Sequence, residues 1–213
     1  MTYISDILPT LLSGLKMTLG VFAITLIGSL PLGGLVALGL RSPFFALRWV
    51  LNGYVWIMRG TPMLLQLIFI YYGLGMIGLP LGRFESVAFA FILNYAAYFA
   101  EIFRGGFQAV AKGQMDAAQV LGFSRLQTLR KIILPQVFKI VLPSVGNEVI
   151  NLIKDTSLVY VIGLGDLLRA GNIAAIRDVT LVPYALVGLI YLLLTAIATF
   201  GLRRIEGKYA QWR

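Results

Sequence analysis

The chain has 213 residues, of which 59% are hydrophobic and only 13% charged, and its formal net charge is +9. This composition is typical of a membrane protein. The absence of cysteine and histidine excludes disulfides, thiolate chemistry and the usual transition-metal ligands. No Gly-x4-Gly-Lys-Ser/Thr phosphate loop occurs, so we expect no catalytic residue, no metal site and no cofactor in this chain.

Long apolar segments recur along the whole chain. Met17–Leu40 and Val179–Leu202 carry no charge, and each exceeds the ~20 helical residues that cross a bilayer core. Three further apolar segments carry charges at or within their edges. We therefore predict an all-α membrane protein with a single transmembrane domain, 1–213. It has five spans, with an elbow between the third and the fourth. The spans are expected at about 10–40, 49–77, 85–111, 137–163 and 180–203, and the elbow at 113–135.

Lysine and arginine residues are concentrated in every second predicted loop. Segments 41–48, 112–139 and 203–213 hold 2, 5 and 4 of the 18 lysines and arginines, whereas 78–85 and 166–178 hold 1 and 2. Two predicted spans separate each basic-rich segment from the next, so all three lie on one side, which the positive-inside rule assigns to the cytoplasm. We expect an outside N-terminus, a cytoplasmic C-terminus, no cleavable signal peptide and no nucleic-acid partner.

A proline interrupts the second predicted span. Arg59 precedes Gly60-Thr61-Pro62, and proline kinks a helix and frees carbonyls that must face protein or a wet cavity. Two interpretations remain open: a break that lines a pathway, favoured for Thr61, or a packing kink in which Arg59 pairs with an acid. In the third span, Glu101 and Arg104 have the spacing of a helical ion pair near the inner face.

The predicted elbow reads as two short helices with a corner. Asp116 lies near the start of the first helix, where a carboxylate favours the helix dipole. Gly122 can adopt the left-handed conformation that ends a helix. Ser124 and Gln127 have the spacing of a capping box, and Pro135 is expected to end the second helix so that the fourth span begins at a new angle.

Three polar residues share one face of the fourth span. Glu148, Asn151 and Asp155 stand at i, i+3 and i+7, and a helix that begins near Phe138 places Glu148 ~15 Å deep. Charges in a bilayer need a partner or a cavity. One interpretation is a substrate pocket. The other is structural pairing, of Glu148 with Arg59 or Arg104 and of Asp155 with Lys154 or Arg177, which is favoured for Asp155.

The elbow carries a motif with wide spacing. The motif begins with Asp116-Ala117-Ala118, continues after three residues with Gly122, and ends after nine more with Ile132-Ile133-Leu134-Pro135. It resembles the Glu-Ala-Ala-x3-Gly-x9-Ile-x-Leu-Pro signature of ATP-binding-cassette (ABC) importer permeases, with aspartate for glutamate. Other segments, in the right order, resemble the polar amino acid permeases of the histidine, glutamine and cystine uptake group: Gly14–Leu19, Arg59–Gln66, Ala97-Tyr98 with Glu101 and Arg104, Gly113-Gln114 and Lys154–Leu158.

This resemblance implies a permease of the type I importer fold that moves a polar amino acid into the cytoplasm by alternating access. It implies a prokaryotic inner membrane, a second permease subunit (identical or paralogous), an ABC ATPase dimer that binds ATP and Mg, and an extracytoplasmic amino-acid-binding protein. Small Ala117 and Ala118 would let the elbow enter a groove on the ATPase. The alternative is an ion-coupled secondary carrier that uses Glu148 as a proton site, which would not need the elbow.

The predicted site residues form two groups. The substrate-pathway group is Glu148, Asn151, Asp155, Thr61, Arg59 and Gln66. The ATPase-coupling group is Asp116, Ala117, Ala118, Gly122, Ile132, Leu134 and Pro135.

Overall fold

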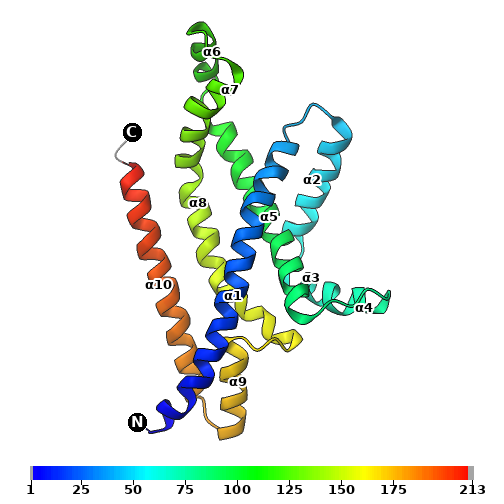
Figure 1. Cartoon of the computed structure of the whole chain (residues 1–213), viewed down its shortest axis with the longest axis vertical. Helices are drawn as coiled ribbons and strands as arrows, with labels where there is room; N and C mark the ends of the chain where they lie inside the picture. The colour runs from blue at the N-terminus through cyan, green and yellow to red at the C-terminus, as the bar shows by residue number, and fades with distance from the viewer. Residues whose placement is uncertain (1, 211–213) are drawn as a thin grey trace.

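The computed structural model describes residues 2–210 (Figure 1). Within this range the chain is helical and has no strand. Its elements, with η1 and η2 π-helical and η3 a 3-10 helix, are α1 (Thr2–Gly39), α2 (Phe45–Gly60), α3 (Met63–Ile68), η1 (Phe69–Gly73), α4 (Leu74–Met76), α5 (Arg83–Ala109), α6 (Gly113–Val120), α7 (Arg125–Thr128), η2 (Leu129–Ile133), α8 (Leu134–Asp155), η3 (Thr156–Ile162), α9 (Leu167–Asp178) and α10 (Val182–Ala210).

Four helices of the described chain are long and apolar enough to cross a membrane, and there are five crossings if a bent pair counts as one span. The four are Tyr3–Gly39, Arg83–Ala109, Arg125–Ile162 and Val182–Tyr209. The bent pair is Phe45–Gly60 with Met63–Met76. The predicted fold class, an all-α membrane protein, is confirmed.

The second predicted span, 49–77, is not one kinked helix. Its two halves are bent by 107°. Thr61 is extended, at φ −122° and ψ 149°, because the ring of the following Pro62 disfavours helical geometry in the residue before it. As a result, α3 and η1 run sideways from the lower end of α2 and pack against α5, and α4 extends away from the bundle (Figure 1).

The fourth span also differs from its prediction. Pro135 does not end a helix: Arg125–Ile162 is one span of 38 residues. The turn before Pro135 is the π-helical segment η2, and α8 follows it with proline in its first turn. A π-helical turn widens the backbone where the proline ring would clash and its missing donor would leave a gap.

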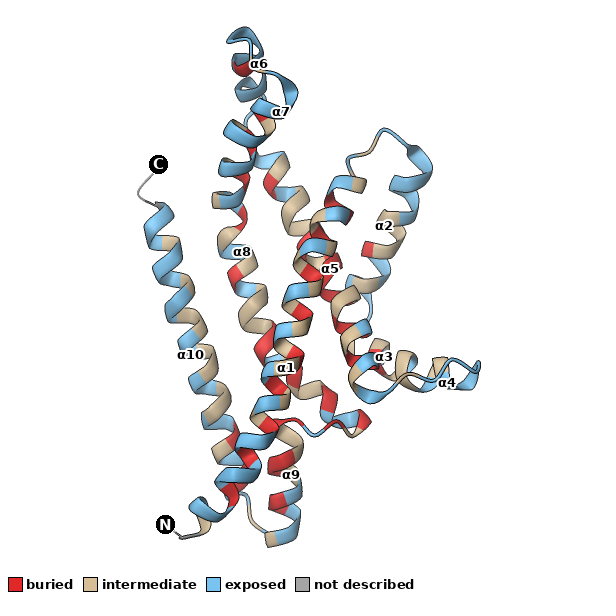
Figure 2. Ribbon diagram, viewed as in Figure 1, coloured by how far each residue is buried: buried red, intermediate tan, exposed pale blue. Residues whose placement is uncertain are grey.

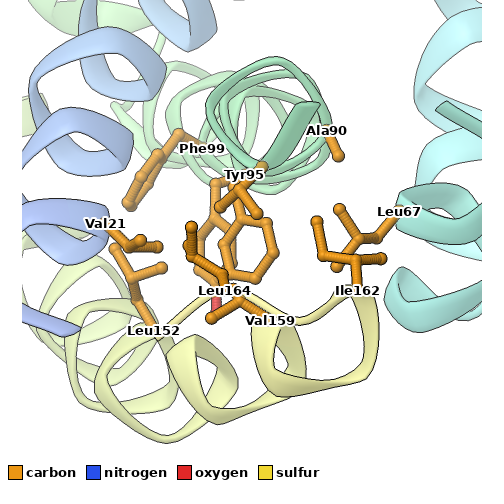
Figure 3. Close-up of a cluster of buried hydrophobic side chains, with 11 residues drawn as sticks. Val21, Leu67, Ala90, Tyr95, Phe99, Leu152, Val159, Ile162 and Leu164 are labelled. Atoms are coloured by element: carbon orange, nitrogen blue, oxygen red, sulfur yellow. The ribbon is translucent and has the colours of Figure 1, made fainter. Parts of the chain in front are cut away.

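Helix α5 is the centre of the bundle. In the most apolar 18-residue stretch of α5, 56% is buried within the chain, whereas only 6% of the corresponding stretch of α10 is buried (Figure 2). Its most extensive contact is with α1, where small residues allow close approach: a Cβ at Gly33 would lie 2.7 Å from the Cβ of Phe99. Figure 3 shows the main apolar cluster, in which Tyr95 and Phe99 of α5 meet Val21 of α1 and Leu152 of α8.

The two ends of the bundle differ in character. The α1–α2 turn, the elbow α6–α7 and the last described turn of α10 lie at one end, and α9 with the start of α1 lies at the other (Figure 1). We call these the elbow end and the α9 end. The basic-rich segments 41–48 and 112–139 are therefore together at the elbow end. The described part of the third basic-rich segment, 203–210, lies there as well.

Candidate functional site

A polar pocket lies in the middle of the bundle. Its volume is about 260 Å³. Elements α3, α5 and α8 contribute its lining, which is made of Met63, Asn94, Tyr95, Tyr98, Glu148, Asn151 and Asp155. We call it the central pocket. Its wall therefore joins chain segments that are far apart in the sequence.

The polar stripe of the fourth span faces this pocket. Glu148, Asn151 and Asp155 all line it, as the interpretation of the stripe as a pocket requires. The Tyr95 hydroxyl donates to Asp155 Oδ2 at 2.7 Å, so one carboxylate already has a hydrogen-bond partner. Among residues 2–210, neither Glu148 nor Asp155 has an ion-pair partner within 4.0 Å.

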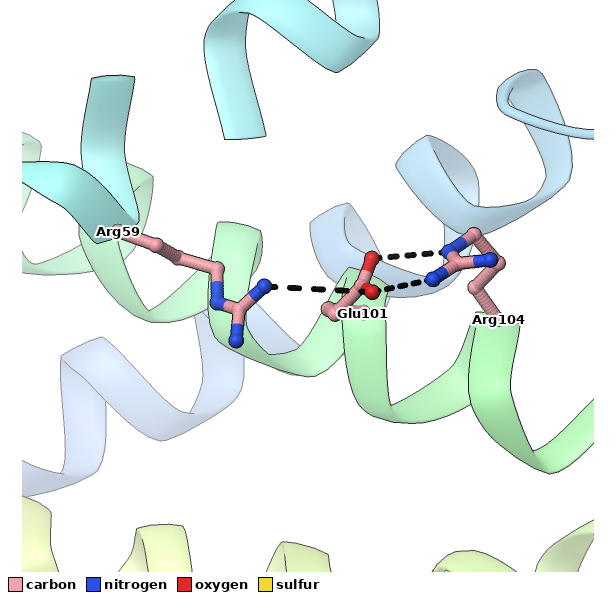
Figure 4. A network of polar contacts seen from close by, with 3 residues as sticks. All are labelled: Arg59, Glu101 and Arg104. Carbon is pink, nitrogen blue, oxygen red and sulfur yellow. Dashed lines mark hydrogen bonds and ion pairs between the residues drawn. The ribbon is translucent and has the colours of Figure 1, made fainter. Parts of the chain in front are cut away.

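The cations predicted as partners of these acids are bound elsewhere. Arg104 donates Nε to Glu101 Oε2 at 2.9 Å and Nη2 to the other oxygen, so the predicted Glu101–Arg104 pair is confirmed (Figure 4). Arg59 approaches the same carboxylate from the other side at 4.0 Å, and lies over the Tyr98 ring at 5.5 Å from its centroid. Arg177 pairs with Asp178. Within residues 2–210, Lys154 also forms no ion pair within 4.0 Å, so none of the ion pairs considered for Glu148 and Asp155 is present.

Thr61 and Gln66 hold the bend of the second span and do not line the pocket. Thr61 Oγ1 donates to the Ile57 carbonyl at 2.8 Å, and Gln66 Nε2 donates to Thr61 Oγ1 at 2.7 Å and to the Met58 carbonyl at 3.0 Å. Asn94 Nδ2 donates to Met58 and to Gln66 Oε1, both at 2.9 Å. Carbonyls freed by the break thus have partners, as their depth requires.

Sequence reasoning missed four lining residues: Met63, Asn94, Tyr95 and Tyr98. A signal for two of them exists, because Asn94 and Tyr98 stand four apart in an apolar span and so share a helix face. Met63 carries no such signal. It reaches the pocket because α3 turns sideways after Pro62.

The corner of the elbow has the predicted local geometry. Gly122 is left-handed at φ +76°. The Phe123 amide donates to the Ala118 carbonyl and the Gly122 amide to the Gln119 carbonyl, both at 3.0 Å, a Schellman motif that caps the last turn of α6. Ser124 and Gln127 form both hydrogen bonds of the predicted capping box at the start of α7.

The predicted docking role of Ala118 needs correction. Ala118 is 1% exposed within this chain, because α6 packs that face against α7 and η2. At 100° per residue, the opposite face of α6 carries Asp116 and Val120, and Ala117 lies on the flank. Val120 is 87% exposed and Leu121 73%, so the surface available to a partner is this outer face.

The remaining predicted coupling residues follow the corner. Leu134 is 41% exposed, Pro135 is exposed and Ile132 is half-buried. Ile132 packs beside the cluster of Ile133, Val137 and Val141, which joins the second part of the elbow to the bundle.

Two acids at the α9 end have local structural roles. Asp166 caps α9 by accepting from the Leu168 and Arg169 amides, and its burial raises its pKa to about 6. A hydrogen bond from Arg177 and another from Tyr3 lower the pKa of Asp178 to about 2. Among the described residues, no group of three His, Cys, Asp or Glu side chains is placed to hold a metal ion.

Comparisons with known proteins identify the family of this chain. Residues 29–211 match the family described as "Binding-protein-dependent transport system inner membrane component". The chain is 38% identical to the arginine transport system permease protein ArtQ of Bacillus subtilis, covering 94% of this chain and 93% of ArtQ. It is 37% identical to the glutamine transport system permease protein GlnP of Escherichia coli (strain K12), covering 93% and 92%.

Solved structures are similar over nearly the whole chain. One, the "Crystal structure of an amino acid ABC transporter with histidines", has a TM-score of 0.91 at 34% identity and 97% coverage of both chains. A MetNI methionine ABC transporter in an inward-facing conformation shares the fold, with a TM-score of 0.74 at 18% identity and 98% coverage of both chains. The alternative of a secondary carrier has no support among these relatives.

Proposed function

The chain belongs to the family of binding-protein-dependent transport system inner membrane components and is a permease subunit of an amino acid ABC importer, and we propose that it passes a cationic amino acid through the central pocket. The observation that carries this proposal is the pair of carboxylates, Glu148 and Asp155, that line the pocket without an ion-pair partner among the described residues.

The charge of the pocket favours a cation. A carboxylate inside a membrane protein costs free energy unless a partner or water compensates it. Tyr95 compensates Asp155 in part, which leaves Glu148 to receive a guanidinium, imidazolium or ammonium group. Asn151 adds a neutral donor and acceptor, and Asn94, whose amide nitrogen already donates to Met58 and Gln66, adds its side-chain oxygen to orient the rest of the substrate. A relative named as an arginine permease is consistent with this substrate class.

ATP hydrolysis takes place on a separate chain, and the elbow is the proposed contact with it. The exposed Val120 supplies an apolar side chain and Asp116 a charge on this outer face, and the exposed Leu121 follows at the C-terminal end of α6. Closure of an ATPase pair would move the elbow, and the continuous helix Arg125–Ile162 would carry that movement to Glu148 and Asp155. Alternating access requires only that the closed ATPase bind one permease conformation better.

The rest of the assembly follows from the two ends of the bundle. We place the elbow end in the cytoplasm, because the basic segments gather there, and the α9 end outside, facing the extracytoplasmic binding protein. A second permease subunit, identical or paralogous, completes the pathway. Single cysteines test the orientation: Gln119→Cys should react with an impermeant thiol reagent only after the membrane is opened, and Ile176→Cys in intact spheroplasts. Labelling of Gln119→Cys from outside would reverse the assignment.

Uptake by the reconstituted complex tests the substrate site. In proteoliposomes with the ATPase and the binding protein, Glu148→Gln should lower arginine uptake about tenfold or more, because a charge-assisted hydrogen bond contributes ~1.5–3 kcal/mol. Asp155→Asn should lower it less. Glu85→Gln, at an exposed acid outside the pocket, is the matched control. Unchanged uptake in Glu148→Gln at normal expression would show that this carboxylate does not bind substrate.

A further inference from the structure

A second pocket lies between the central pocket and the elbow end of the bundle. Its volume is about 400 Å³, and it opens between the α1–α2 turn and α5. Its lining consists of Leu40, Arg41, Asn52, Glu101, Arg104, Phe107 and Gln108. We call it the end pocket. It holds two guanidinium groups and one carboxylate, so its charge balance is opposite to that of the central pocket.

The two pockets share one face of α5. Asn94 and Tyr98 line the central pocket, and Glu101, Arg104 and Gln108 line the end pocket. These five residues follow one another at intervals of three or four, the spacing of a single helix face. About 15 Å of helix separates Tyr98 from Gln108. A polar face of this length is expensive against lipid, so it indicates a wet route between the pockets.

Arg59 stands at the boundary of this route. Its guanidinium lies over the ring of Tyr98, which lines the central pocket, and approaches Glu101, which lines the end pocket. The 4.0 Å approach is the loosest contact of the network, because both oxygens of Glu101 already accept from Arg104 (Figure 4). Arg59 can therefore leave Glu101 without leaving that carboxylate unpaired.

The end pocket contains a guanidinium group, that of Arg41, whose hydrogen-bond donors are available to a ligand. The Arg41 guanidinium stacks on the Phe107 ring at 4.4 Å from its centroid, and within residues 2–210 it has neither a hydrogen-bond acceptor nor an ion-pair partner. The stacking holds the planar group in place and leaves its N–H edge open. A guanidinium edge recognises a carboxylate bidentately. The one acid in the lining, Glu101, is occupied by Arg104.

We propose that the end pocket is a second amino-acid subsite, which receives the α-carboxylate of the substrate through Arg41 after the substrate has passed Arg59. This inference rests on the proposed transport of an amino acid through the central pocket. The cationic side chain binds first, at Glu148. The carboxylate binds next, where the reversed charge weakens the hold on the cation and favours release at the elbow end.

Ligand binding to the purified permease–ATPase complex, without the binding protein, tests the subsite. Equilibrium dialysis with labelled arginine should resolve a tighter and a weaker site in each permease chain. Arg41→Gln should weaken the second site about tenfold or more, by loss of a charge-assisted hydrogen bond, and leave the first unchanged. Arg48→Gln removes the same charge from the first turn of α2, outside the lining of the end pocket, and should change neither site. Glu148→Gln should weaken only the first.

Agmatine, which is arginine without its carboxylate, separates carboxylate binding from general cation binding: it should fill the first site and not the second. Retention of the weaker site in Arg41→Gln, or its occupation by agmatine, would overturn the proposal. So would a weaker site that vanishes when nanodiscs contain phosphatidylglycerol or when inorganic phosphate is added, because the pocket would then hold a phosphate group. Normal uptake in Glu148→Gln would instead refute the proposed function and leave the Arg41 result to be judged separately.

Discussion

In the elbow, each hydrogen bond that shapes the corner joins residues no more than five apart, from the Schellman motif at Gly122 to the capping box of Ser124 and Gln127. In the central pocket, the contacts join separate elements: Tyr95 of α5 binds Asp155 of α8, and Asn94 of α5 binds Met58 of α2. The elbow can therefore keep its shape when its docking face changes, whereas a change in one wall of the pocket disturbs another.

A substitution on the outer face of the elbow is expected to have the largest effect, on binding of the ATPase. Val120→Asp places a carboxylate on a surface that is exposed in this chain and that the proposed contact with the ATPase would cover. An unpaired buried charge costs ~3–5 kcal/mol. Co-purification of the ATPase through a tag on this chain should fall about a hundredfold or more, while circular dichroism of the permease stays unchanged. Gln119→Asp, one residue away on the flank of α6, is the control. Equal loss in both would indicate general damage to the elbow.

Asn94→Leu tests whether the pocket depends on tertiary contacts. It removes the donor to Gln66 Oε1 and one of two donors to the Met58 carbonyl, which still accepts from Gln66 Nε2. Leaving the half-buried Gln66 Oε1 without its partner costs ~1–3 kcal/mol. We expect arginine uptake to fall about tenfold and limited proteolysis near the α2–α3 break to accelerate. Thr195→Val, in α10 and outside the lining of the central pocket, should leave both unchanged. Unaltered proteolysis together with reduced uptake would mean that Asn94 acts on substrate alone.

Gly122→Val tests the local geometry of the corner. The backbone is left-handed there at φ +76°, and a Cβ would meet nothing within 4 Å, so the cost is conformational alone. Strain of ~1–3 kcal/mol is expected for a β-branched residue. Stimulation of the ATPase by the loaded binding protein should fall about tenfold. Gly113→Ala, in the same elbow with negative φ and open space, should have no effect. Wild-type stimulation in Gly122→Val would mean that the corner is not the coupling element.

The smallest effect is expected at a second local cap, at the α9 end. Asp166→Ala removes the acceptor for two amides of α9, at a cost of ~1 kcal/mol, and hydrogen exchange of residues 167–178 should accelerate about fivefold. Asp166→Asn retains the cap. Exchange that stays slow in Asp166→Ala would mean that packing against α1 and α10 holds α9 without the cap.

The same residue predicts a pH dependence. Burial raises the pKa of Asp166 from 3.8 to about 6, so the folded state binds the proton more tightly than the unfolded state. The stabilisation by protonation is complete below pH 3.8 and is lost as the pH rises through about 6. Exchange corrected for its intrinsic rate should therefore be slower at pH 4 than at pH 7, and Asp166→Asn should remove the difference.

The sequence alone was sufficient for features whose cause is local. Hydropathy indicated the apolar helices, because a bilayer requires runs of about 20 apolar residues. The corner at Gly122 and the capping box at Ser124 were predictable because the hydrogen bonds that form them connect near neighbours. The stripe of Glu148, Asn151 and Asp155 was predictable as a shared face, because helical periodicity determines which residues point the same way.

Only the tertiary structure decided what those faces meet. The sequence predicted a kink at Pro62, but the 107° turn that brings Met63 to the pocket depends on how Asn94 and Gln66 hold the freed Met58 carbonyl. It left Arg59 free to pair with several acids, and packing of α2 against α5 placed it beside Glu101. Ala118 looked like a docking residue until α6 folded back on η2 and buried it. Each outcome depends on which helices pack together, and helix packing joins residues too far apart in the chain for any local pattern to record.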